Sequence, residues 1–494
     1  MRYDVLWRRA ALLVVFALVV GCSSGGLTAP VQPREPTVSR PEAFIEVTRI
    51  VENAFWDADS LKPPVMLKSA VEGMDADLRR QGGKISAKDE QLAVSLDGQT
   101  KLIDLSSVGS ISEFIHTFVD FYNFVLQHQR LNGHPPSWEY RAIEGMIKAL
   151  DSTSAFMPPH EFREMQEETR GSFGGIGIRI GLEDGQVIVA EPMEGTPAAK
   201  AGLKQGDRIV KIDGQSTQGM TLQDAVRRMR GPVGSRVVLG ILRPGATEPQ
   251  EVSIIRAKIE LKTVENQVLD GHIGYIKVRG FHETTLHETE KAMTRLIQQK
   301  VEGLILDLRN NPGGMLSQSV KVCNLFVDEG LVVVSTEGRV RNQNSRFIAN
   351  GGGQYRHYPI IVLINAGSAS GSEIVAGALQ DLQKATLIGT KSYGKGSVQT
   401  IFPLQDGSGL RLTTAHYFTP SGRSIDHVGI TPDIELVNDG KDDRQLNMAH
   451  AIMKEALAAA SQGKPQRQPG AVQVDSSVIK ALGRGMLAAP LPEP

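Results

Sequence analysis

Residues 359–399 read PIIVLINAGSASGSEIVAGALQDLQKATLIGTKSYGKGSVQ, and they decide the fold of the largest part of the chain. The stretch opens with a continuous apolar run from Pro359 to Ile364, which is typical of a strand buried on both faces. From Ser370 onward, apolar residues recur every three to four positions, which predicts a helix. Residues 370–373, SGSE, have the pattern of a capping box and mark where this helix begins. A hydroxyl group is therefore expected where a buried strand leads into a helix N-terminus.

The segment 259–437 around this stretch alternates predicted strands with predicted helices. Apolar runs such as Ile273–Val278 indicate buried strands, and amphipathic helical patterns lie between them. This alternation predicts a layered α/β sheet domain. The strand-to-helix turns at Gly313-Gly314 and at Ser370 are then expected to open at one end of the sheet, where the sites of α/β proteins lie.

The length and composition of the chain limit its function. At 494 residues the chain is too long for one compact core, and about three domains are expected. A formal net charge of −1 without a basic stripe argues against a nucleic-acid-binding protein. The 11 histidines form neither an HExxH motif nor a cluster with cysteine, so we predict no metal site and no cofactor.

Residues 1–22 have the features of a targeting segment, because three arginines precede a short apolar run. Residues 18–22, LVVGC, resemble a bacterial lipoprotein signal, which implies cleavage before Cys22 and a lipid on its sulfur. The alternative is an ordinary secretory signal with a chance cysteine. By the same resemblance, Ser23 implies a periplasmic protein that is anchored to the outer membrane by its lipid. Residues 23–41, rich in Gly, Ser, Thr and Pro, are predicted to be a flexible tether.

Residues 42–170 are predicted to form a helical N-terminal region with an internal duplication. The segments 70–78, AVEGMDADL, and 142–150, AIEGMIKAL, match at Ala, Glu, Gly, Met and Leu. We interpret them as the ends of two copies of one helical hairpin, and two copies are too few for a solenoid. Apolar helix pairs of this kind often form dimer contacts, which predicts a homo-oligomer. The alternative is a helical cap on the rest of the chain.

Residues 171–258 resemble a PDZ domain in the order of their predicted strands, turns and helix. The match includes Gly174-Gly175-Ile176-Gly177, which corresponds to the loop that holds a peptide carboxylate in such domains. Successive backbone N–H groups in a glycine-permitted turn can form an anion site, while the next strand edge pairs with the peptide. The resemblance implies protein or peptide partners with free C-termini. The alternative is a tight turn that opens a small β-domain.

Residues 438–494 are predicted to contain a C-terminal helix and a partly disordered tail. Leu446–Ala460 has the apolar spacing of a helix. Residues 462–474 are rich in Gln, Pro and Gly, which predicts disorder. Val478–Leu487 has the pattern of a short amphipathic helix, which we interpret as a contact element.

Ser370 needs a base before it can act as a nucleophile, because a serine hydroxyl is weakly nucleophilic on its own. One candidate is a histidine, either His416 or His427, assisted by Asp426. Nothing in the sequence near these histidines marks them for that role. The other candidate is Lys395, because burial disfavours the charged form of a lysine and leaves an amine that can accept a proton.

Lys395 lies in the motif YGKGSVQ, with a glycine on either side and Gln399 four residues later. If residues 395–399 form a strand, Lys395 and Gln399 share one face. The amide oxygen of Gln399 can then accept a hydrogen bond from the lysine nitrogen and orient it. The flanking glycines allow another backbone to pass close by. Neither Ser370 nor Lys395 is by itself specific evidence for a catalytic site.

Several stretches together resemble the carboxy-terminal processing peptidases, also called tail-specific proteases. They are LINAGSASGSEIVAGALQD, YGKGSVQ, LRNNPGG, AIEGMIKALD and the PDZ segment, and they fall within residues 113–437. The resemblance implies a layered α/β peptidase core of the ClpP/crotonase-like type in 259–437. It also implies that Ser370, among three neighbouring serines, is the nucleophile, that Lys395 is the general base, and that Gln399 orients the lysine.

The same resemblance implies an oxyanion hole built from backbone N–H groups. Gly371 stands where the family usually has alanine, and its N–H can still point at a developing negative charge. A second donor is expected from Gly313 or Gly314. The departure at Gly371 affects only the local stiffness of the chain.

The resemblance therefore implies a serine endopeptidase that recognises proteins by their C-terminal tails and cleaves them there by acyl transfer. One alternative is a non-catalytic PDZ scaffold that keeps the peptidase fold as a binding module. Another is a hydrolase of small acyl substrates, against which the PDZ segment argues. Retention of Ser370, Lys395 and Gln399 together favours the enzyme over the scaffold. The sequence leaves open whether an adaptor protein delivers the substrate.

Overall fold

The computed structural model describes residues 40–129, 136–438, 440 and 442–462. The predicted signal segment with Cys22, and the predicted contact helix Val478–Leu487, lie outside the described residues. None of the helices in the described ranges is both long and apolar enough to cross a bilayer. Within the same ranges, no group of three or more His, Cys, Asp or Glu side chains is arranged to hold a metal ion.

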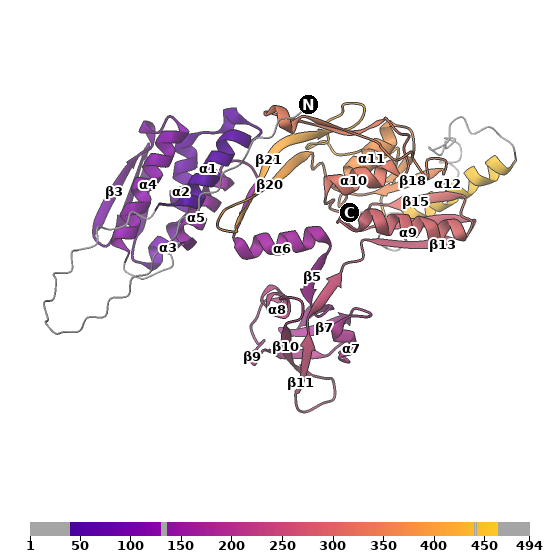
Figure 1. The fold of residues 1–494 in the computed structure, drawn as a ribbon, viewed down its shortest axis with the longest axis horizontal. Coiled ribbons are helices and arrows are strands. Elements are labelled where there is room, and N and C mark those ends of the chain that lie inside the picture. Colours follow the sequence, from indigo (N-terminus) through magenta and orange to yellow (C-terminus); the bar gives the residue numbers. More distant parts are fainter. Residues whose placement is uncertain (1–39, 130–135, 439, 441, 463–494) are drawn as a thin grey trace, which may run out of the picture. The chain divides into compact units, whose positions relative to one another are not determined.

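A six-stranded sheet forms the centre of the predicted α/β domain (Figure 1). Its spatial order is β13 (Val264–Leu269), β14 (Ile273–Val278), β15 (Gly303–Asp307), β18 (Ile360–Ile364), β19 (Thr386–Gly389) and β22 (Ile434–Glu435). The last five strands are parallel, and β13 pairs antiparallel with β14 at one edge. Because parallel strands end at the same edge of a sheet, the loops that follow β15 and β18 meet there.

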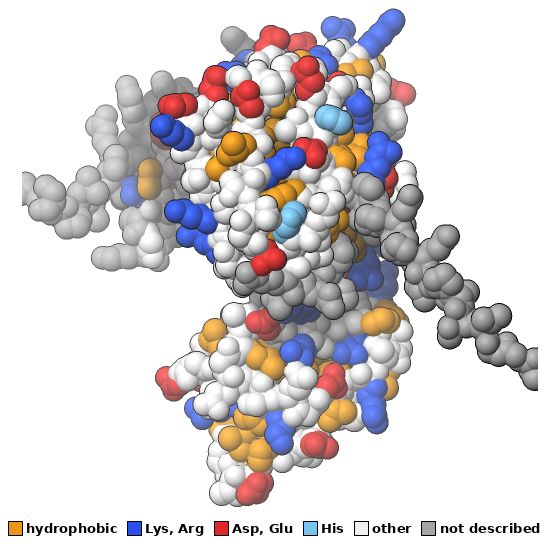
Figure 2. All heavy atoms as spheres, turned by 90° about the vertical axis from the view of Figure 1, so that its left-hand side faces the viewer, with side chains coloured by type: hydrophobic (Ala, Val, Ile, Leu, Met, Phe, Trp, Pro, Cys, Tyr) orange, Lys and Arg blue, Asp and Glu red, His pale blue; other side chains and the backbone are white. Residues whose placement is uncertain are grey.

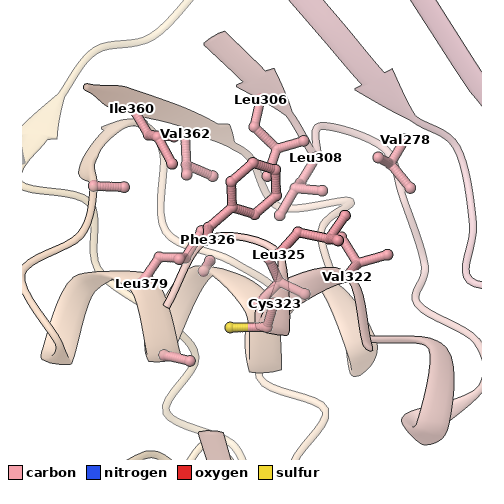
Figure 3. Packing of buried hydrophobic residues seen from close by; sticks show 14 of the residues in the cluster. Val278, Leu306, Leu308, Val322, Cys323, Leu325, Phe326, Ile360, Val362 and Leu379 are labelled. Carbon is pink, nitrogen blue, oxygen red and sulfur yellow. The ribbon is translucent and has the colours of Figure 1, made fainter. Parts of the chain in front are cut away.

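Three helices cover one face of this sheet: α9 (Thr285–Gln298), α10 (Leu316–Asn324) and α11 (Gly371–Asp381). Figure 3 shows part of the buried cluster between them. Leu306 and Val362 of the sheet face Val322 of α10 and Leu379 of α11. Continuous apolar strands such as Gly303–Asp307 are explained by burial on both faces of the sheet.

The helix α12 (Arg444–Ser461) covers the opposite face of the sheet. Its Ile452 and Met453 share a buried cluster with Ile305 and Leu363, the strand residues that point away from α9, α10 and α11. The boundary predicted at residue 437 falls just before α12, which packs on the sheet of the preceding segment. The apolar stripe of α12 covers a sheet face that would otherwise be exposed to water.

A long antiparallel ribbon of β20 (Ser397–Pro403) and β21 (Gly409–Phe418) belongs to a second sheet. The other strands of that sheet are β16 (Val332–Gly338), β17 (Ser345–Ile348) and β4 (Ala155–Met157). The turn end of the ribbon is buried in the core of the helical N-terminal region, through Leu404, Leu410 and Leu412. The opposite end carries the segment of Lys395 and Gln399, so the helical region anchors the element that holds both residues.

The N-terminal region combines helices with a three-stranded meander. Its helices are α1 (Glu42–Ala54), α2 (Pro63–Gly73), α3 (Asp75–Arg80), α4 (Ile111–His128), α5 (Pro136–Lys148) and α6 (Pro159–Arg170). Its strands are β1 (Lys84–Lys88), β2 (Gln91–Leu96) and β3 (Gln99–Asp104). The meander has the alternating pattern of a half-buried sheet, because Leu92, Val94 and Leu96 of β2 are buried.

The two repeated segments of this region pack against each other, at their glycines. A Cβ atom on Gly73 would lie 2.4 Å from the carbonyl oxygen of Arg141, and one on Gly145 would lie 2.2 Å from that of Ser69. Each carbonyl belongs to the residue four positions before the partner glycine, so the contact is nearly symmetric. The glycines are needed because α2 and α5 approach too closely for any side chain. The homo-oligomer predicted from these helices stays a prediction.

Residues 171–258 form a small β-rich domain with two short strands at its entry and exit. These are β5 (Ser172–Gly175) and β12 (Ala257–Glu260), which pair with each other. The spatial order of the main strands is β11 (Gln250–Ile255), β10 (Arg236–Leu242), β8 (Arg208–Ile212), β7 (Gln186–Pro192) and β6 (Ile178–Glu183). The remaining elements are β9 (Gln215–Ser216), α7 (Pro197–Lys200) and α8 (Leu222–Met229). The strand β6 lies at the edge of this sheet and offers unpaired backbone groups.

The face drawn in Figure 2 carries Lys and Arg side chains mixed with Asp and Glu side chains. Neither sign of charge forms a continuous stripe on that face. This distribution matches the formal net charge of −1 for the whole chain.

Candidate active site

Ser370 occupies the N-cap of α11, directly after the loop that follows β18. Its backbone has φ 51° and ψ −110°, a conformation that residues other than glycine rarely adopt. Such a residue costs on the order of 1–3 kcal/mol and persists only where its surroundings hold it. Here the Ser370 N–H donates to Glu373 Oε2 at 2.7 Å, and its carbonyl accepts from Ile374.

Only one half of the predicted capping box is formed. Glu373 binds the backbone of Ser370, but the Ser370 hydroxyl makes no capping hydrogen bond in the described part of the chain. The helix is therefore capped by the carboxylate, and the hydroxyl stays available for other chemistry. In the sequence pattern, the Ser370 hydroxyl is a candidate both for capping the helix and for nucleophilic attack. In the structure Glu373 does the capping, so the two roles do not conflict.

Glu373 is fully buried and joins the nucleophile to the lysine loop. Its Oε2 accepts from the N–H groups of Ser370 at 2.7 Å and Lys395 at 2.9 Å. Its Oε1 accepts from the Gly394 N–H and the Ser392 hydroxyl, both at 2.6 Å. One carboxylate thus fixes two segments that lie more than 20 residues apart in sequence. The sequence pattern indicates Glu373 only as the last residue of the capping box.

Lys395 lies where the loop after β19 passes close to residues 426–429. A Cβ atom on Gly396 would lie 2.2 Å from the backbone nitrogen of Asp426, so the flanking glycine allows the close approach that the sequence predicts. Burial lowers the pKa of the Lys395 ammonium, and the neighbouring Arg411 cation lowers it further. Both effects favour a neutral amine. Within the described residues, no hydrogen bond joins the Lys395 side chain to the Ser370 hydroxyl.

Gln399 lies on β20, where a bulge between Val398 and Gln399 interrupts the pairing with β21. Its Nε2 donates to Thr413 Oγ1 at 2.8 Å and to Thr153 Oγ1 at 3.1 Å. Its Oε1 is buried and has no partner among the described residues. A buried amide oxygen is costly to leave without a donor, so Oε1 is an acceptor with capacity for a further hydrogen bond.

The loop 309–314 lies against the start of α11, as the sequence predicts for one end of the sheet. A Cβ atom on Gly313 would lie 2.7 Å from the backbone nitrogen of Gly371 and 2.8 Å from Ser370 Cβ. The Gly313 N–H donates to Asn311 Oδ1 at 2.9 Å, so it is occupied within its own loop. The N–H groups of Gly314 and Gly371 have no acceptor among the described residues. Of the two alternatives predicted for the second oxyanion donor, Gly314 is the one whose N–H has no acceptor among the described residues, and its role as a donor stays a prediction.

Gly371 is closely surrounded on the side where an alanine methyl would lie. A Cβ atom there would approach Ser319 Oγ to 2.3 Å and the ring of Phe281 to 3.0 Å. Ser319 of α10 is fully buried and donates to the Met315 carbonyl. In this chain the serine hydroxyl fills the volume of the methyl group, so an alanine at position 371 would require Ser319 to move.

The two histidines considered as bases do not reach the nucleophile. His416 Nδ1 lies 3.4 Å from Asp426 Oδ2, and His427 Nε2 lies 3.5 Å from the same oxygen. The His427 side chain is 93% exposed. Within the described residues, neither ring is hydrogen bonded to Ser370.

The predicted carboxylate loop lines one end of a groove between β6 and α8. The groove has a volume of about 390 Å³ and is mainly apolar, with walls that include Ile178, Ile180, Val226 and Met229. Gly175, Ile176 and Gly177 lie at its end, and Gly177 has a left-handed φ of 76°. Gly174 pairs with β12 instead, and a Cβ atom there would lie 2.1 Å from the Gly231 carbonyl oxygen. Gly174 therefore serves close packing and does not line the groove.

The sequence is similar to proteins of known class over most of the domains just described. Residues 272–436 match peptidase family S41, and residues 188–243 match the PDZ domain. A carboxy-terminal-processing protease of Bartonella bacilliformis is 48% identical over 297 residues, which cover 59% of this chain and 68% of that protein. A carboxyl-terminal-processing protease of Synechocystis is 41% identical over 301 residues, which cover 60% of this chain and 70% of that protein.

Among solved structures, a photosystem II D1 C-terminal processing protease is similar, with 28% identity and a TM-score of 0.45. That alignment covers 81% of this chain and 93% of the solved one. The sequence matches define the class of the protein, which is a serine-type peptidase with a PDZ domain and not a non-catalytic scaffold. The chain belongs to peptidase family S41, with the carboxy-terminal processing proteases as its relatives.

Proposed function

We propose that the protein is an endopeptidase with a Ser370–Lys395 dyad, assisted by Gln399, that acts at or near the C-terminal tails of proteins. The observation that carries the proposal is the buried Glu373 carboxylate, which binds the backbone N–H groups of both Ser370 and Lys395. The lowered pKa of Lys395 supports its role as the base, because a neutral amine is the form that accepts a proton. We also propose that the α/β core has the ClpP/crotonase-like layering.

The proposed reaction begins when the neutral Lys395 amine takes the proton of the Ser370 hydroxyl. The Ser370 oxygen then forms a bond to the carbonyl carbon of the peptide, and the negative charge on the carbonyl oxygen is held by the N–H groups of Gly314 and Gly371. When the C–N bond breaks, the Lys395 ammonium returns its proton to the leaving amine. Water then attacks the acyl-enzyme, again with Lys395 as the base, which releases the acid and restores the Ser370 hydroxyl.

We further propose that the groove between β6 and α8 captures the free C-terminus of the substrate. The edge position of β6 provides backbone groups for an added strand, and the apolar walls fit an apolar terminal residue. We expect backbone N–H groups of Gly175–Gly177, which line the groove, to bind the terminal carboxylate.

Capture of the C-terminus predicts that a protein substrate with a free terminal carboxylate is cleaved with a KM about tenfold or more below that of its C-terminal amide. The reason is the loss of charge-assisted hydrogen bonds when the carboxylate becomes an amide. Steady-state kinetics on the two substrates measure the difference. Met229→Lys in the groove should abolish the preference, whereas Leu182→Lys on the exposed part of β6 should keep it. Equal KM values for acid and amide would contradict tail capture.

We propose a periplasmic location with a lipid anchor on Cys22 in the outer membrane, supported by the signal-like sequence of residues 1–22. Replacing Cys22 by serine should move the protein from the membrane fraction to the soluble periplasmic fraction, because the thiol that carries the lipid is lost. Cell fractionation with immunoblotting measures the change. A Cys22→Ser variant that stays in the membrane fraction would refute lipidation.

A further inference from the structure

The side-chain amide of Gln399 has one orientation, and one of the residues that fix it comes from another region of the chain. Its Nε2 donates to Thr153 Oγ1 at 3.1 Å, to Thr413 Oγ1 at 2.8 Å and to Ser397 Oγ at 3.3 Å. Thr413 is on β21, whereas Thr153 lies in the loop between α5 and β4, at the end of the helical N-terminal region. The opposite end of the amide, Oε1, is buried and without a partner among the described residues.

The direction of these hydrogen bonds is set by Asp151. Thr153 Oγ1 lies 3.0 Å from Asp151 Oδ1, and an ionised carboxylate can only accept. The Thr153 hydrogen therefore points at Asp151, and the lone pairs of the Thr153 oxygen are left for the Gln399 N–H. A hydroxyl in this position can accept from Nε2 but has no hydrogen to donate to Oε1. The hydrogen bond from Thr153 to Asp151 thus determines that Nε2 of Gln399, and not Oε1, faces the Thr153 hydroxyl.

Asp151 is held in its ionised form by its own loop. It accepts from the N–H groups of Thr153 and Ser154 and from the Ser154 hydroxyl. Burial opposes ionisation of Asp151. Hydrogen bonds from the Ser154 N–H, the Thr413 hydroxyl and the Thr153 N–H outweigh burial and keep its pKa below the usual range. At neutral pH the carboxylate is consequently an acceptor on both oxygens.

We propose that the loop Asp151–Ser154 is a positioning element of the active site, which turns the Gln399 carbonyl oxygen toward the Lys395 amine. The proposal rests on the proposed Ser370–Lys395 dyad. Asp151 and Thr153 act through Gln399 and do not touch the substrate. The loop lies in the helical N-terminal region, outside residues 272–436, which match peptidase family S41. Its Asp151 is the last residue of AIEGMIKALD, one of the stretches that resemble the carboxy-terminal processing peptidases.

The chemical consequence concerns the lone pair of Lys395. A carbonyl oxygen that accepts one N–H of the neutral amine leaves the nitrogen lone pair free to take the Ser370 proton. A reversed amide would direct its own N–H at that lone pair and compete with Ser370 for it. Correct orientation of Gln399 is therefore a condition for Lys395 to work as a base.

The test exchanges acceptor for donor at Asp151 without a change of size. In Asp151→Asn, the new amide N–H can donate to Thr153, whose hydroxyl hydrogen then turns to Gln399 and favours the reversed amide. We expect kcat to fall about tenfold or more with KM within about twofold. The acidic limb of the pH–kcat profile should move to lower pH, because an N–H directed at Lys395 disfavours its ammonium form. The other ionisable groups around Lys395 are unchanged: Arg411, which lowers its pKa, Glu373, which binds its N–H, and Asp426, which binds the Gly396 N–H and lies near His416.

Two further variants separate positioning from folding. Thr153→Val removes the hydroxyl and should lower kcat in the same way, whereas Thr153→Ser should keep near-normal kcat and pH profile. Asp104→Asn is the control, because Asp104 accepts from the Ser106 N–H and hydroxyl in a turn of the same kind that is exposed and lies in the N-terminal region. Thermal unfolding is recorded for each variant.

Unchanged kcat and pH profiles in both Asp151→Asn and Thr153→Val would overturn the proposal. It would also be overturned if activity fell in both variants with the acidic limb in its original place, since that is the result of a purely structural role. The turnover of Lys395→Ala shows whether the positioning proposal alone is wrong or whether the proposed dyad is wrong as well. If Lys395→Ala is inactive while Asp151→Asn behaves as the unaltered enzyme, the dyad stands and only the positioning role falls.

Discussion

Lys395→Ala is expected to lower the turnover of a peptide substrate by ~10³-fold or more, and Ser370→Ala by a similar factor. Neither residue is expected to support catalysis without the other, because the hydroxyl needs the amine to take its proton. The double variant should therefore be no worse than either single one. Folding should persist, since the Ser370 hydroxyl makes no capping hydrogen bond and only the backbone of Lys395 binds Glu373.

The same pair predicts how the rate depends on pH. The rate should rise with pH as the Lys395 ammonium loses its proton, because only the neutral amine is a base. Since burial and then Arg411 lower the pKa of Lys395, the plateau should be reached below the ordinary lysine pKa of about 10.4. Arg411→Gln should move this rise to higher pH, because it removes the nearby positive charge.

The measurements for this prediction are initial rates over a pH series and labelling of Ser370 by a serine-reactive fluorophosphonate. Lys391→Ala is the matched control, since Lys391 is an exposed lysine four residues upstream in the same loop. It should behave as the unaltered enzyme. Appreciable turnover by either Ser370→Ala or Lys395→Ala would refute the dyad.

Glu373→Ala should be the most damaging single change outside the dyad. It leaves the N–H groups of Ser370, Gly394 and Lys395, and the Ser392 hydroxyl, without their acceptor in a buried site. Each such group costs about 1–3 kcal/mol, although relaxation and entering water reduce the total. We expect the free energy of unfolding to fall by about 3–5 kcal/mol. Labelling of Ser370 should slow by about 100-fold, because the strained φ of Ser370 is no longer held.

Glu113 provides a control of the same local type. It is the third residue of α4, and it accepts from the Gly109 N–H and the Ser110 hydroxyl at the exposed start of that helix. Glu113→Ala should lower the stability far less than Glu373→Ala, because water can replace the lost carboxylate at an exposed helix start, and it should leave labelling unchanged. Denaturant unfolding and labelling rates, measured on both variants, give the comparison. A Glu373→Ala protein that is labelled at the normal rate would show that the carboxylate does not position the site.

Local patterns in the sequence predicted the elements around the nucleophile because the forces that form them are local. The apolar run before Ser370 is explained by a strand buried on both faces, and the spacing after it by a helix with one buried side. The packing of α12 across the predicted boundary at residue 437 is not local. The apolar stripe of α12 is visible in the sequence, but the sheet face that it covers is assembled from strands far away along the chain.

Family resemblance selected Ser370 among three neighbouring serines, and residue spacing could not have done so. The structure then separated groups that the motif treats alike. Of the two glycines in the 309–314 loop, Gly313 donates its N–H to Asn311, whereas the Gly314 N–H has no acceptor among the described residues. In the PDZ motif, Gly174 packs against Gly231, while the next three residues line the groove. Adjacent glycines are equivalent in the sequence motif, and they differ only in their hydrogen-bond partners and packing contacts in the folded protein.

The sequence by itself determined that a serine hydroxyl follows a buried strand at the start of a helix, with glycines that permit a close approach nearby. Only the tertiary structure decided that Glu373, not the Ser370 hydroxyl, caps that helix and also holds the Lys395 loop. It likewise decided which way the Gln399 amide faces, through Thr413 and Thr153. The physical reason is that hydrogen-bond partners are set by which segments meet in space, and residues 153, 399 and 413 come together only when the helical region and the β20–β21 ribbon have packed.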